Sequence, residues 1–293
     1  MNNKVGIYYA YWTHEWDVDF HPFVDKVADL GFDVLEVNGG TVGRMSKEER
    51  KRLLDHASAR GLELTYCIGI PKEYDLASEN SEIRGKGSDF LLNLIYAVGE
   101  MGGGDLSGIL YGTWPATMPE SNLTRQDYLD LSLESVRKVA KAAEDHNVVL
   151  CMEIVNRFEQ FLMNTAAEGV EYCKEINSPN VKLLLDTFHM NIEEDSISSA
   201  VETAGSFLGH VHLGENHRMP PGCGHGHINW NELASALKKT GFKGSLVMEP
   251  FLVPGGQVGK DIKIWRDQSV GYDLDTEARK ACAFMKKTLE AAG

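Results

Sequence analysis

Short apolar runs alternate along the chain with longer amphipathic stretches. The runs are rich in β-branched and aromatic residues, and they are nearly continuous, which is typical of parallel strands buried on both faces. We predict strands at Val5–Trp12, Asp33–Val37, Leu62–Ile68, Gly108–Trp114, Val148–Val155, Val181–Thr187, Leu208–Leu213 and Ser245–Phe251.

The stretches between these runs repeat apolar residues at helical spacing. Glycines directly after three of them, Gly31, Gly61 and Gly241, indicate helix C-caps. We predict helices at Pro22–Leu30, Lys47–Arg60, Ser81–Gly102, Thr124–His146, Thr165–Ile176, Ser196–Ala204, Asn229–Thr240 and Asp275–Ala292.

This regular strand–helix order favours one fold over its competitor. An open doubly wound sheet usually carries a glycine-rich phosphate turn after its first strand. The segment Trp12–Trp16 has no glycine, and neither Gly39–Gly40 nor Gly102–Gly104 matches the spacing of that turn. Eight strand–helix units in 293 residues fit a closed barrel. We therefore predict an α/β fold, a single (β/α)₈ TIM barrel over residues 1–293.

The charge and the cysteine content restrict the classes of binding partner and the cellular compartment that we expect. The chain has 29 Lys and Arg against 43 Asp and Glu, a net charge of −14, which disfavours nucleic-acid and membrane-surface partners. No apolar stretch reaches the length of a membrane span, and the N-terminal run reads as a strand rather than a signal peptide. Five dispersed cysteines without CxxC spacing fit a reducing compartment, so we expect a cytoplasmic protein.

The last four predicted strands each carry one carboxylate or imidazole near the C-terminal end: Glu153, Asp186, His212 and Glu249. In a TIM barrel these strand ends surround one mouth. A lone charge in a buried strand is unfavourable unless it is paired or binds a metal. Three oxygen ligands and one nitrogen ligand suit Mn²⁺, Co²⁺ or Mg²⁺ better than a structural zinc ion. We predict one divalent metal site from these four residues.

Two of the four, Glu153 and Glu249, come from strands that are separated by two others, so they can face a substrate from opposite sides. A two-base epimerisation beside a carbonyl requires this arrangement. One carboxylate removes a proton, the metal stabilises the enediolate, and the other carboxylate returns a proton to the opposite face.

Further polar and aromatic residues follow the strands. Glu159, His189 and Arg218 come after strands five, six and seven, where they can bind sugar hydroxyls. Tyr8, Trp16, Trp114 and Phe251 lie at or after strands one, four and eight, where aromatic rings can stack on a sugar. The segment His217–His227 is rich in histidine, but its spacing matches no standard zinc pattern and we interpret it as a loop.

Several long motifs resemble those of the ketose 3-epimerases, the D-tagatose 3-epimerase and D-psicose (D-allulose) 3-epimerase group of xylose-isomerase-like TIM barrels. The resemblance runs from about residue 4 to about residue 270, and its motifs are Gly6–Trp12, Glu153–Glu159, Leu185–Glu194, Val247–Phe251 and Ile262–Asp267.

The resemblance implies C3 epimerisation of free ketoses, of the D-fructose/D-psicose or D-tagatose/D-sorbose type, by a homodimer or homotetramer. It implies Mn²⁺ or Co²⁺ held by the four strand-end residues, with Glu153 and Glu249 also as the acid/base pair. By the same resemblance, Glu159, His189 and Arg218 hold the O1–O2 end of the sugar, and the four aromatic residues named above form its hydrophobic wall.

The chain departs from the family pattern in loops that would border C4 to C6 of the sugar: Asn38–Thr41, Cys67–Pro71, Gly214–Arg218 and Gly224–His227. The departures leave the metal ligands and the base pair intact. The sequence therefore leaves the preferred ketose open.

Two other classes of function stay open from the sequence. An aldose–ketose isomerase or an inosose dehydratase on the same barrel would also use a metal and remove a proton beside a carbonyl. A non-catalytic sugar-binding barrel is the second alternative, and the intact Glu153 and Glu249 argue against it. A phosphorylated substrate is disfavoured by the acidic charge and the missing glycine-rich cradle.

Overall fold

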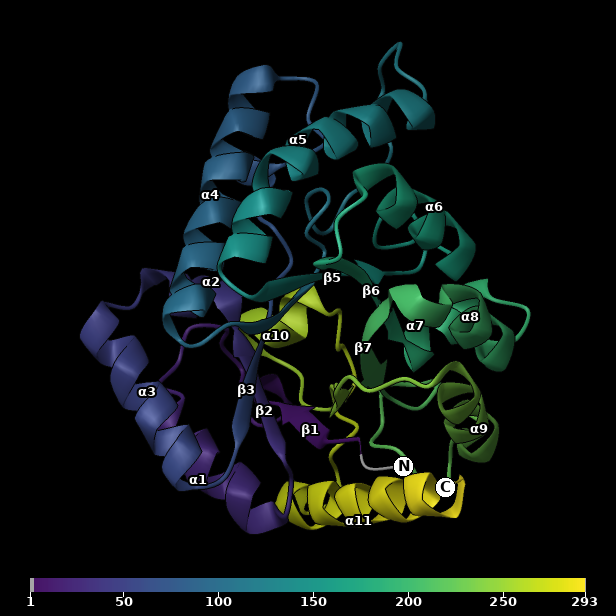
Figure 1. Ribbon diagram of the computed structural model, residues 1–293. Helices are drawn as coiled ribbons and strands as arrows, with labels where there is room; N and C mark the ends of the chain where they lie inside the picture. The colour runs from purple at the N-terminus through teal and green to yellow at the C-terminus, as the bar shows by residue number, and fades with distance from the viewer. Residues whose placement is uncertain (1–2, 293) are drawn as a thin grey trace.

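A computed structural model describes residues 3–292 of the protein. Its strands are parallel and close into a barrel in chain order, with helices around the outside (Figure 1). The predicted (β/α)₈ TIM barrel is confirmed. The strands are β1 (Val5–Tyr8), β2 (Val34–Asn38), β3 (Glu63–Cys67), β4 (Gly104–Gly108), β5 (Val148–Ile154), β6 (Val181–Asp186), β7 (Leu208–Leu213) and β8 (Leu246–Met248).

The outer helices match the predicted amphipathic stretches closely. They are α1 (His21–Leu30), α3 (Lys47–Ala59), α4 (Ser81–Glu100), α5 (Arg125–Asp145), α6 (Ala166–Ile176), α8 (Ile197–Ala204), α9 (Trp230–Thr240) and α11 (Leu274–Ala292). Gly31 and Gly241 are the left-handed C-caps of α1 and α9, as predicted. The last helix, α11, packs against α1, α9 and β1.

Short helical segments that the periodicity did not predict lie in the connections. The longer ones follow the C-terminal ends of strands: α2 (Gly39–Arg44) after β2, α7 (Thr187–Glu193) after β6, and α10 (Gly256–Asp261) after β8. Residues 3–292 also contain three 3₁₀ turns: η1 (Tyr9–Tyr11), η2 (Lys72–Tyr74) and η3 (Gly205–Phe207). The first of these corrects the predicted first strand, which ends at Tyr8 rather than at Trp12.

The fourth strand was predicted in the wrong place. It pairs with β5 from Gly104 to Gly108, whereas the apolar segment after it is buried but outside the ladder. Gly108 ends the strand with φ 112°, and a Cβ there would lie 2.2 Å from the carbonyl oxygen of Ile68. Because β4 itself contains only one large apolar residue, Leu106, the hydrophobic pattern pointed to the neighbouring run instead.

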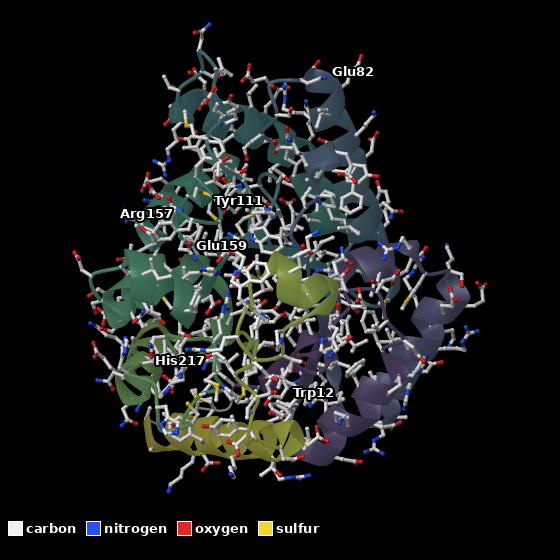
Figure 2. The ribbon with its side chains drawn as sticks, turned by 180° about the vertical axis from the view of Figure 1, so that it is seen from behind. Trp12, Glu82, Tyr111, Arg157, Glu159 and His217 are labelled. Atoms are coloured by element: carbon white, nitrogen blue, oxygen red, sulfur yellow. The ribbon has the colours of Figure 1, made fainter. Side chains whose placement is uncertain are left out.

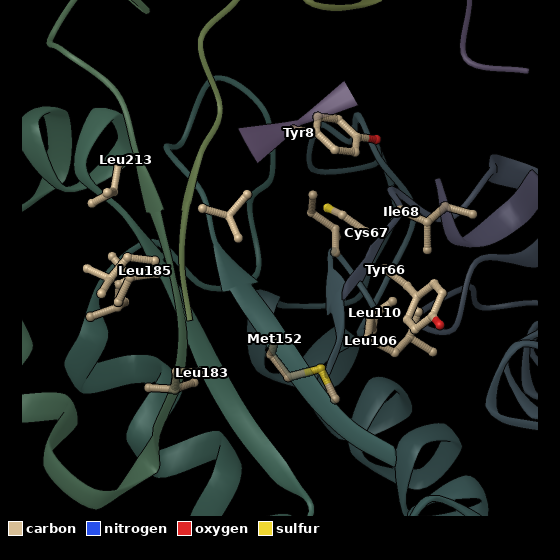
Figure 3. Packing of buried hydrophobic residues seen from close by; sticks show 14 of the residues in the cluster. Tyr8, Tyr66, Cys67, Ile68, Leu106, Leu110, Met152, Leu183, Leu185 and Leu213 are labelled. Atoms are coloured by element: carbon tan, nitrogen blue, oxygen red, sulfur yellow. The ribbon is translucent and has the colours of Figure 1, made fainter. Parts of the chain in front are cut away.

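The interior of the barrel is unusually polar. Strand register places Asp186 beside His212 and Glu36 beside Thr65, whereas TIM barrels commonly fill this space with branched apolar side chains. The alternating apolar residues lie under the helices, and Figure 3 shows Met152 and Leu183 among them. The hydrophobic core therefore surrounds the barrel, while its centre holds charged and hydrogen-bonding groups.

Among residues 3–292, no helix has the length and apolar character needed to cross a membrane. All five cysteines are free thiols, and four of them are buried.

Candidate metal centre and active site

The four predicted metal ligands come together at the C-terminal end of the barrel. Glu153 is the last residue but one of β5, Asp186 ends β6, His212 lies near the end of β7, and Glu249 directly follows β8. Each offers one ligand atom, and these atoms all lie within 4.8 Å of one another. All four side chains are buried. The arrangement follows from the barrel itself, because parallel strands in register bring their last inward-facing residues to one mouth.

The ring of His212 is oriented toward this cluster. Its Nε2 lies 2.8 Å from Oε1 of Glu36, and its Nδ1 lies 3.6 Å from Oε1 of Glu153 and 3.5 Å from Oε2 of Glu249. Nδ1 is buried and makes no hydrogen bond among the described residues 3–292. Burial alone would lower the pKa of His212, but Glu249 and Glu36 outweigh it and raise the pKa. The cluster thus favours a positive charge at Nδ1, which a divalent cation would supply.

Arg218 reaches into the same cluster. Its Nη1 lies 2.5 Å from Oδ2 of Asp186 and 2.9 Å from Oε2 of Glu249, and its guanidinium lies 4.1 Å from the ring centre of Phe188. Burial would raise the pKa of Asp186, but Arg218, His189, His212 and a hydrogen bond from the Phe188 backbone together outweigh it and hold the pKa below its ordinary value. Burial raises the pKa of Glu249, and this effect is larger than the lowering by His212 and Arg218.

The loop after β5 supplies a second polar group. Glu159 accepts hydrogen bonds from Nε1 of Trp114 and from the side-chain amide of Asn156, both at 3.0 Å. The amide of Asn156 also lies 2.8 Å from Nδ1 of His189. Burial would raise the pKa of Glu159, but His189 and Arg218 outweigh it and lower the pKa. Glu159 is therefore an anion with two fixed donors.

Arg157, on the same loop, turns away from the cluster. It pairs with Glu193 at 2.5 Å and its side chain is 65% exposed. Figure 2 shows Arg157 toward the outside of the molecule and Glu159 nearer its centre.

Three of the four predicted aromatic residues lie close together. The ring centre of Tyr8 lies 6.3 Å from those of both Trp16 and Phe251, and the rings of Trp16 and Phe251 are 6.4 Å apart. Trp16 also donates from Nε1 to Asp261 of α10 at 2.9 Å. Phe251 is buried, and its ring centre lies 5.5 Å from the guanidinium of Arg218.

A cavity of about 820 Å³ adjoins the cluster, and Glu153 and Glu249 of the cluster are among its lining residues. Its volume is in the range of small-molecule sites. Glu153, Glu249, Glu159, His189 and Arg218 line one part of it, together with Tyr8, Trp16 and Trp114. The cavity is also lined by residues of loops that depart from the family pattern, among them Asn38, Gly40, Ile68, Gly69 and Pro71.

Sequence reasoning missed Glu36, which contacts His212 from β2. Glu36 has no solvent exposure and stands between Leu35 and Val37 in a buried strand. The rule applied to the last four strands, that a lone carboxylate in an apolar strand needs a partner, would have found it. Burial would raise the pKa of Glu36, but His212 and His210 outweigh it and lower the pKa, so Glu36 is ionised.

The histidine-rich loop takes no part in the cluster. Among residues 3–292 two groups of side chains have metal-site geometry, and neither includes a residue of the His217–His227 segment. Glu215, which precedes this segment, accepts a hydrogen bond from Nε1 of Trp230 at 2.9 Å.

Comparisons with known proteins agree with this architecture. The family model described as xylose isomerase-like TIM barrel matches residues 24–288. D-psicose 3-epimerase of Ruminiclostridium cellulolyticum is 44% identical over 290 residues, 98% of each chain. D-psicose 3-epimerase of Agrobacterium fabrum is 41% identical over 98% of this chain and 99% of its own.

A solved structure shows the same similarity in three dimensions. The crystal structure of D-psicose 3-epimerase with D-tagatose from Clostridium cellulolyticum H10 superposes with a TM-score of 0.94 at 44% identity. It covers 98% of this chain and 99% of the solved one.

Proposed function

Because the chain belongs to the xylose isomerase-like TIM barrels and, among them, to the ketose 3-epimerases, we propose that it epimerises free ketoses at C3 with a divalent metal ion. The chain is a carbohydrate epimerase. This assignment disfavours the aldose–ketose isomerase, the inosose dehydratase and the non-catalytic sugar-binding barrel. The observation that carries the proposal is the buried cluster of Glu153, Asp186, His212 and Glu249, two of which, Glu153 and Glu249, line a cavity large enough for a sugar.

The donor set fits the proposed ion. Three carboxylates and one imidazole suit Mn²⁺ or Co²⁺, with Mg²⁺ as a further candidate. The buried Nδ1 of His212, which has no hydrogen-bond partner in the described chain, supports a cation among these oxygens. When bound, the ion would stabilise the negative charge that develops on the substrate oxygens beside the reacting carbon.

In the proposed reaction, two carboxylates exchange protons with C3, one on each face of the sugar. Glu153 and Glu249 come from β5 and from the end of β8, with β6 and β7 between them, so they approach the cavity from different sides. One carboxylate removes the C3 proton, and the other delivers a proton to the opposite face of the enediolate. The configuration at C3 is inverted while the rest of the sugar is unchanged.

The remaining predicted residues would bind the sugar. We assign the O1–O2 end to Glu159, His189 and Arg218, which line the cavity beside the cluster. Tyr8, Trp16 and Trp114 would face the apolar parts of the sugar, and Phe251 would pack against the first two. A homodimer or homotetramer in the cytoplasm completes the proposal, and the free cysteines fit a reducing compartment.

The proposal is tested with metal-stripped protein in D₂O. We expect no turnover until Mn²⁺ or Co²⁺ is added. D-fructose, D-psicose or D-tagatose should then give the C3 epimer with deuterium at C3, detected by NMR. Epimer formation without deuterium at C3 would contradict proton transfer, and undiminished turnover by the stripped protein would contradict the metal requirement.

A further inference from the structure

Glu36 is a fully buried carboxylate that the proposed reaction does not use. It lies on β2 and has no solvent exposure. Its Oε1 lies 2.8 Å from Nε2 of His212, which belongs to β7 on the other side of the barrel interior. Its Oε2 accepts a hydrogen bond from the Thr65 hydroxyl at 3.0 Å and lies 3.2 Å from Nε2 of His210. Both carboxylate oxygens therefore have fixed partners.

The hydrogen bond between Glu36 and His212 decides which ring nitrogen of His212 faces the proposed metal ligands. A carboxylate accepts hydrogen bonds only, so the nitrogen beside Glu36 carries a proton. This nitrogen is Nε2, which leaves Nδ1 to face Glu153 and Glu249 at 3.6 Å and 3.5 Å. Metal-binding histidines generally donate their other N–H to a carboxylate or carbonyl, which fixes the ring and makes the ligand more basic.

Glu36 also contacts His210, which in turn contacts Asp105 near the N-terminal end of β4. His210 lies two residues before His212 on β7, and its Nδ1 lies 3.1 Å from Oδ2 of Asp105. Asp105 lies near the start of β4 and its side chain is 21% exposed. A row of charged groups thus extends from Asp105 through His210 and Glu36 to His212.

A second interpretation of the same residues is a separate metal position. Glu36, Cys67 and His212 offer ligand atoms within 4.8 Å of one another. However, Nε2 of His212 is already hydrogen-bonded to Glu36, and the ring nitrogen without a partner faces the other cluster. The geometry favours Glu36 as a partner of His212 over Glu36 as a ligand.

We propose that Glu36 is a positioning residue of the metal centre, which orients His212 so that Nδ1 faces Glu153, Asp186 and Glu249. The inference rests on the proposed metal-dependent function. It assigns to Glu36 an effect on metal affinity that is independent of contact with the sugar.

The test compares Mn²⁺ binding by three proteins without sugar, using the EPR signal of free Mn²⁺. Glu36→Gln keeps the shape of the side chain and removes its charge. Glu215→Gln is the matched control, because Glu215 is also a buried carboxylate but is bonded to Trp230. We expect the dissociation constant to rise about 10- to 100-fold in Glu36→Gln and to stay unchanged in Glu215→Gln. At saturating Mn²⁺ the kcat of Glu36→Gln should recover, as a positioning role requires.

Thr65→Val provides a second variant if Glu36→Gln does not fold. It is nearly isosteric and removes only the hydroxyl that holds Glu36, so Mn²⁺ binding should weaken a few-fold. An unchanged dissociation constant for Mn²⁺ in folded Glu36→Gln would overturn the assignment. If Glu36→Gln does not fold, an unchanged constant in Thr65→Val would overturn it. Two ions per chain, falling to one in Cys67→Ser, would favour the separate metal position and overturn it as well.

These results are distinct from failure of the proposed function. A parent protein that binds Mn²⁺ but leaves every ketose unchanged would refute the proposed activity, while the binding comparison would still decide the role of Glu36.

Discussion

The guanidinium of Arg218 donates a hydrogen bond to Asp186 at 2.5 Å in the interior of the barrel mouth. The same nitrogen donates to Glu249 at 2.9 Å, so one buried cation pairs with two of the four proposed metal ligands. Arg218 and a divalent ion would therefore share the same carboxylate oxygens, which links the stability of the metal-stripped protein to Arg218.

Replacing Arg218 with Met should destabilise the metal-stripped protein by about 3 kcal/mol, because a buried ion pair that loses one partner leaves an uncompensated charge. Mn²⁺ should stabilise this variant more than the parent, since the ion replaces the missing positive charge. Urea unfolding with EDTA and with Mn²⁺ measures both effects.

Arg60→Met is the matched control for this change. Arg60 pairs with Asp25 and Asp29 at the surface, where an ion pair contributes only about 0–1 kcal/mol. Equal midpoints for Arg218→Met and the parent in EDTA would show that Arg218 does not neutralise the cluster.

Substituting either proposed base should separate the two halves of the reaction. Glu153→Gln and Glu249→Gln should each slow interconversion of the epimers by roughly 10²- to 10⁴-fold, the usual contribution of a general acid or base. With excess Mn²⁺ in D₂O, each variant should still exchange the C3 proton of one epimer, and the two variants should act on opposite epimers.

NMR of each pure epimer follows this exchange. Glu168→Gln serves as the control, because Glu168 belongs to the N-terminal capping box of α6 and should leave the exchange unaltered. If both active-site variants exchanged the same epimer, a single base would serve both faces and the two-base proposal would be wrong.

The hydrogen bond from Trp114 to Glu159 should affect substrate binding. Trp114→Phe keeps an aromatic ring in the cavity but removes the N–H that Glu159 accepts at 3.0 Å. A hydrogen bond to a charged group contributes about 1.5–3 kcal/mol, so we expect KM to rise by roughly tenfold or more while kcat changes less.

Steady-state kinetics on the preferred ketose measure this effect. Trp12→Phe is the matched control, because Trp12 donates its Nε1 to a different carboxylate, Asp275, at 2.7 Å. A KM for Trp114→Phe equal to that for Trp12→Phe would argue against a role for Glu159 in holding the sugar.

Gly108 should tolerate no side chain. Its φ of 112° is unfavourable for other residues, and an added Cβ would lie 2.2 Å from the carbonyl oxygen of Ile68. We expect Gly108→Ala to destabilise the protein by about 1–3 kcal/mol or to prevent folding.

Gly85→Ala, in the second turn of α4, should change the stability with the opposite sign. A Cβ there meets no atom within 4 Å and the φ is not positive. We expect a gain of about 0.4–1 kcal/mol from the lower entropy of the unfolded chain. Denaturant midpoints of the two variants check both signs, and a stable Gly108→Ala would contradict the close approach to β3.

The sequence by itself predicted the barrel because parallel strands buried on both faces leave long apolar runs, and outer helices leave amphipathic ones. It also predicted that Glu153, Asp186, His212 and Glu249 lie together, since each stands near the end of such a run and a closed barrel brings those ends to one mouth. Both inferences depend only on order along the chain and on the periodicity of each element.

Other features were decided only by the tertiary structure. The fourth strand lies at Gly104–Gly108 because hydrogen bonding to β5, rather than hydrophobicity, defines it. Glu36 is far from His212 in the sequence, and only closure of the barrel brings them to 2.8 Å. Arg218 likewise enters the cluster through the path of its loop. Contacts across the barrel depend on closure and side-chain direction, and local sequence patterns encode neither.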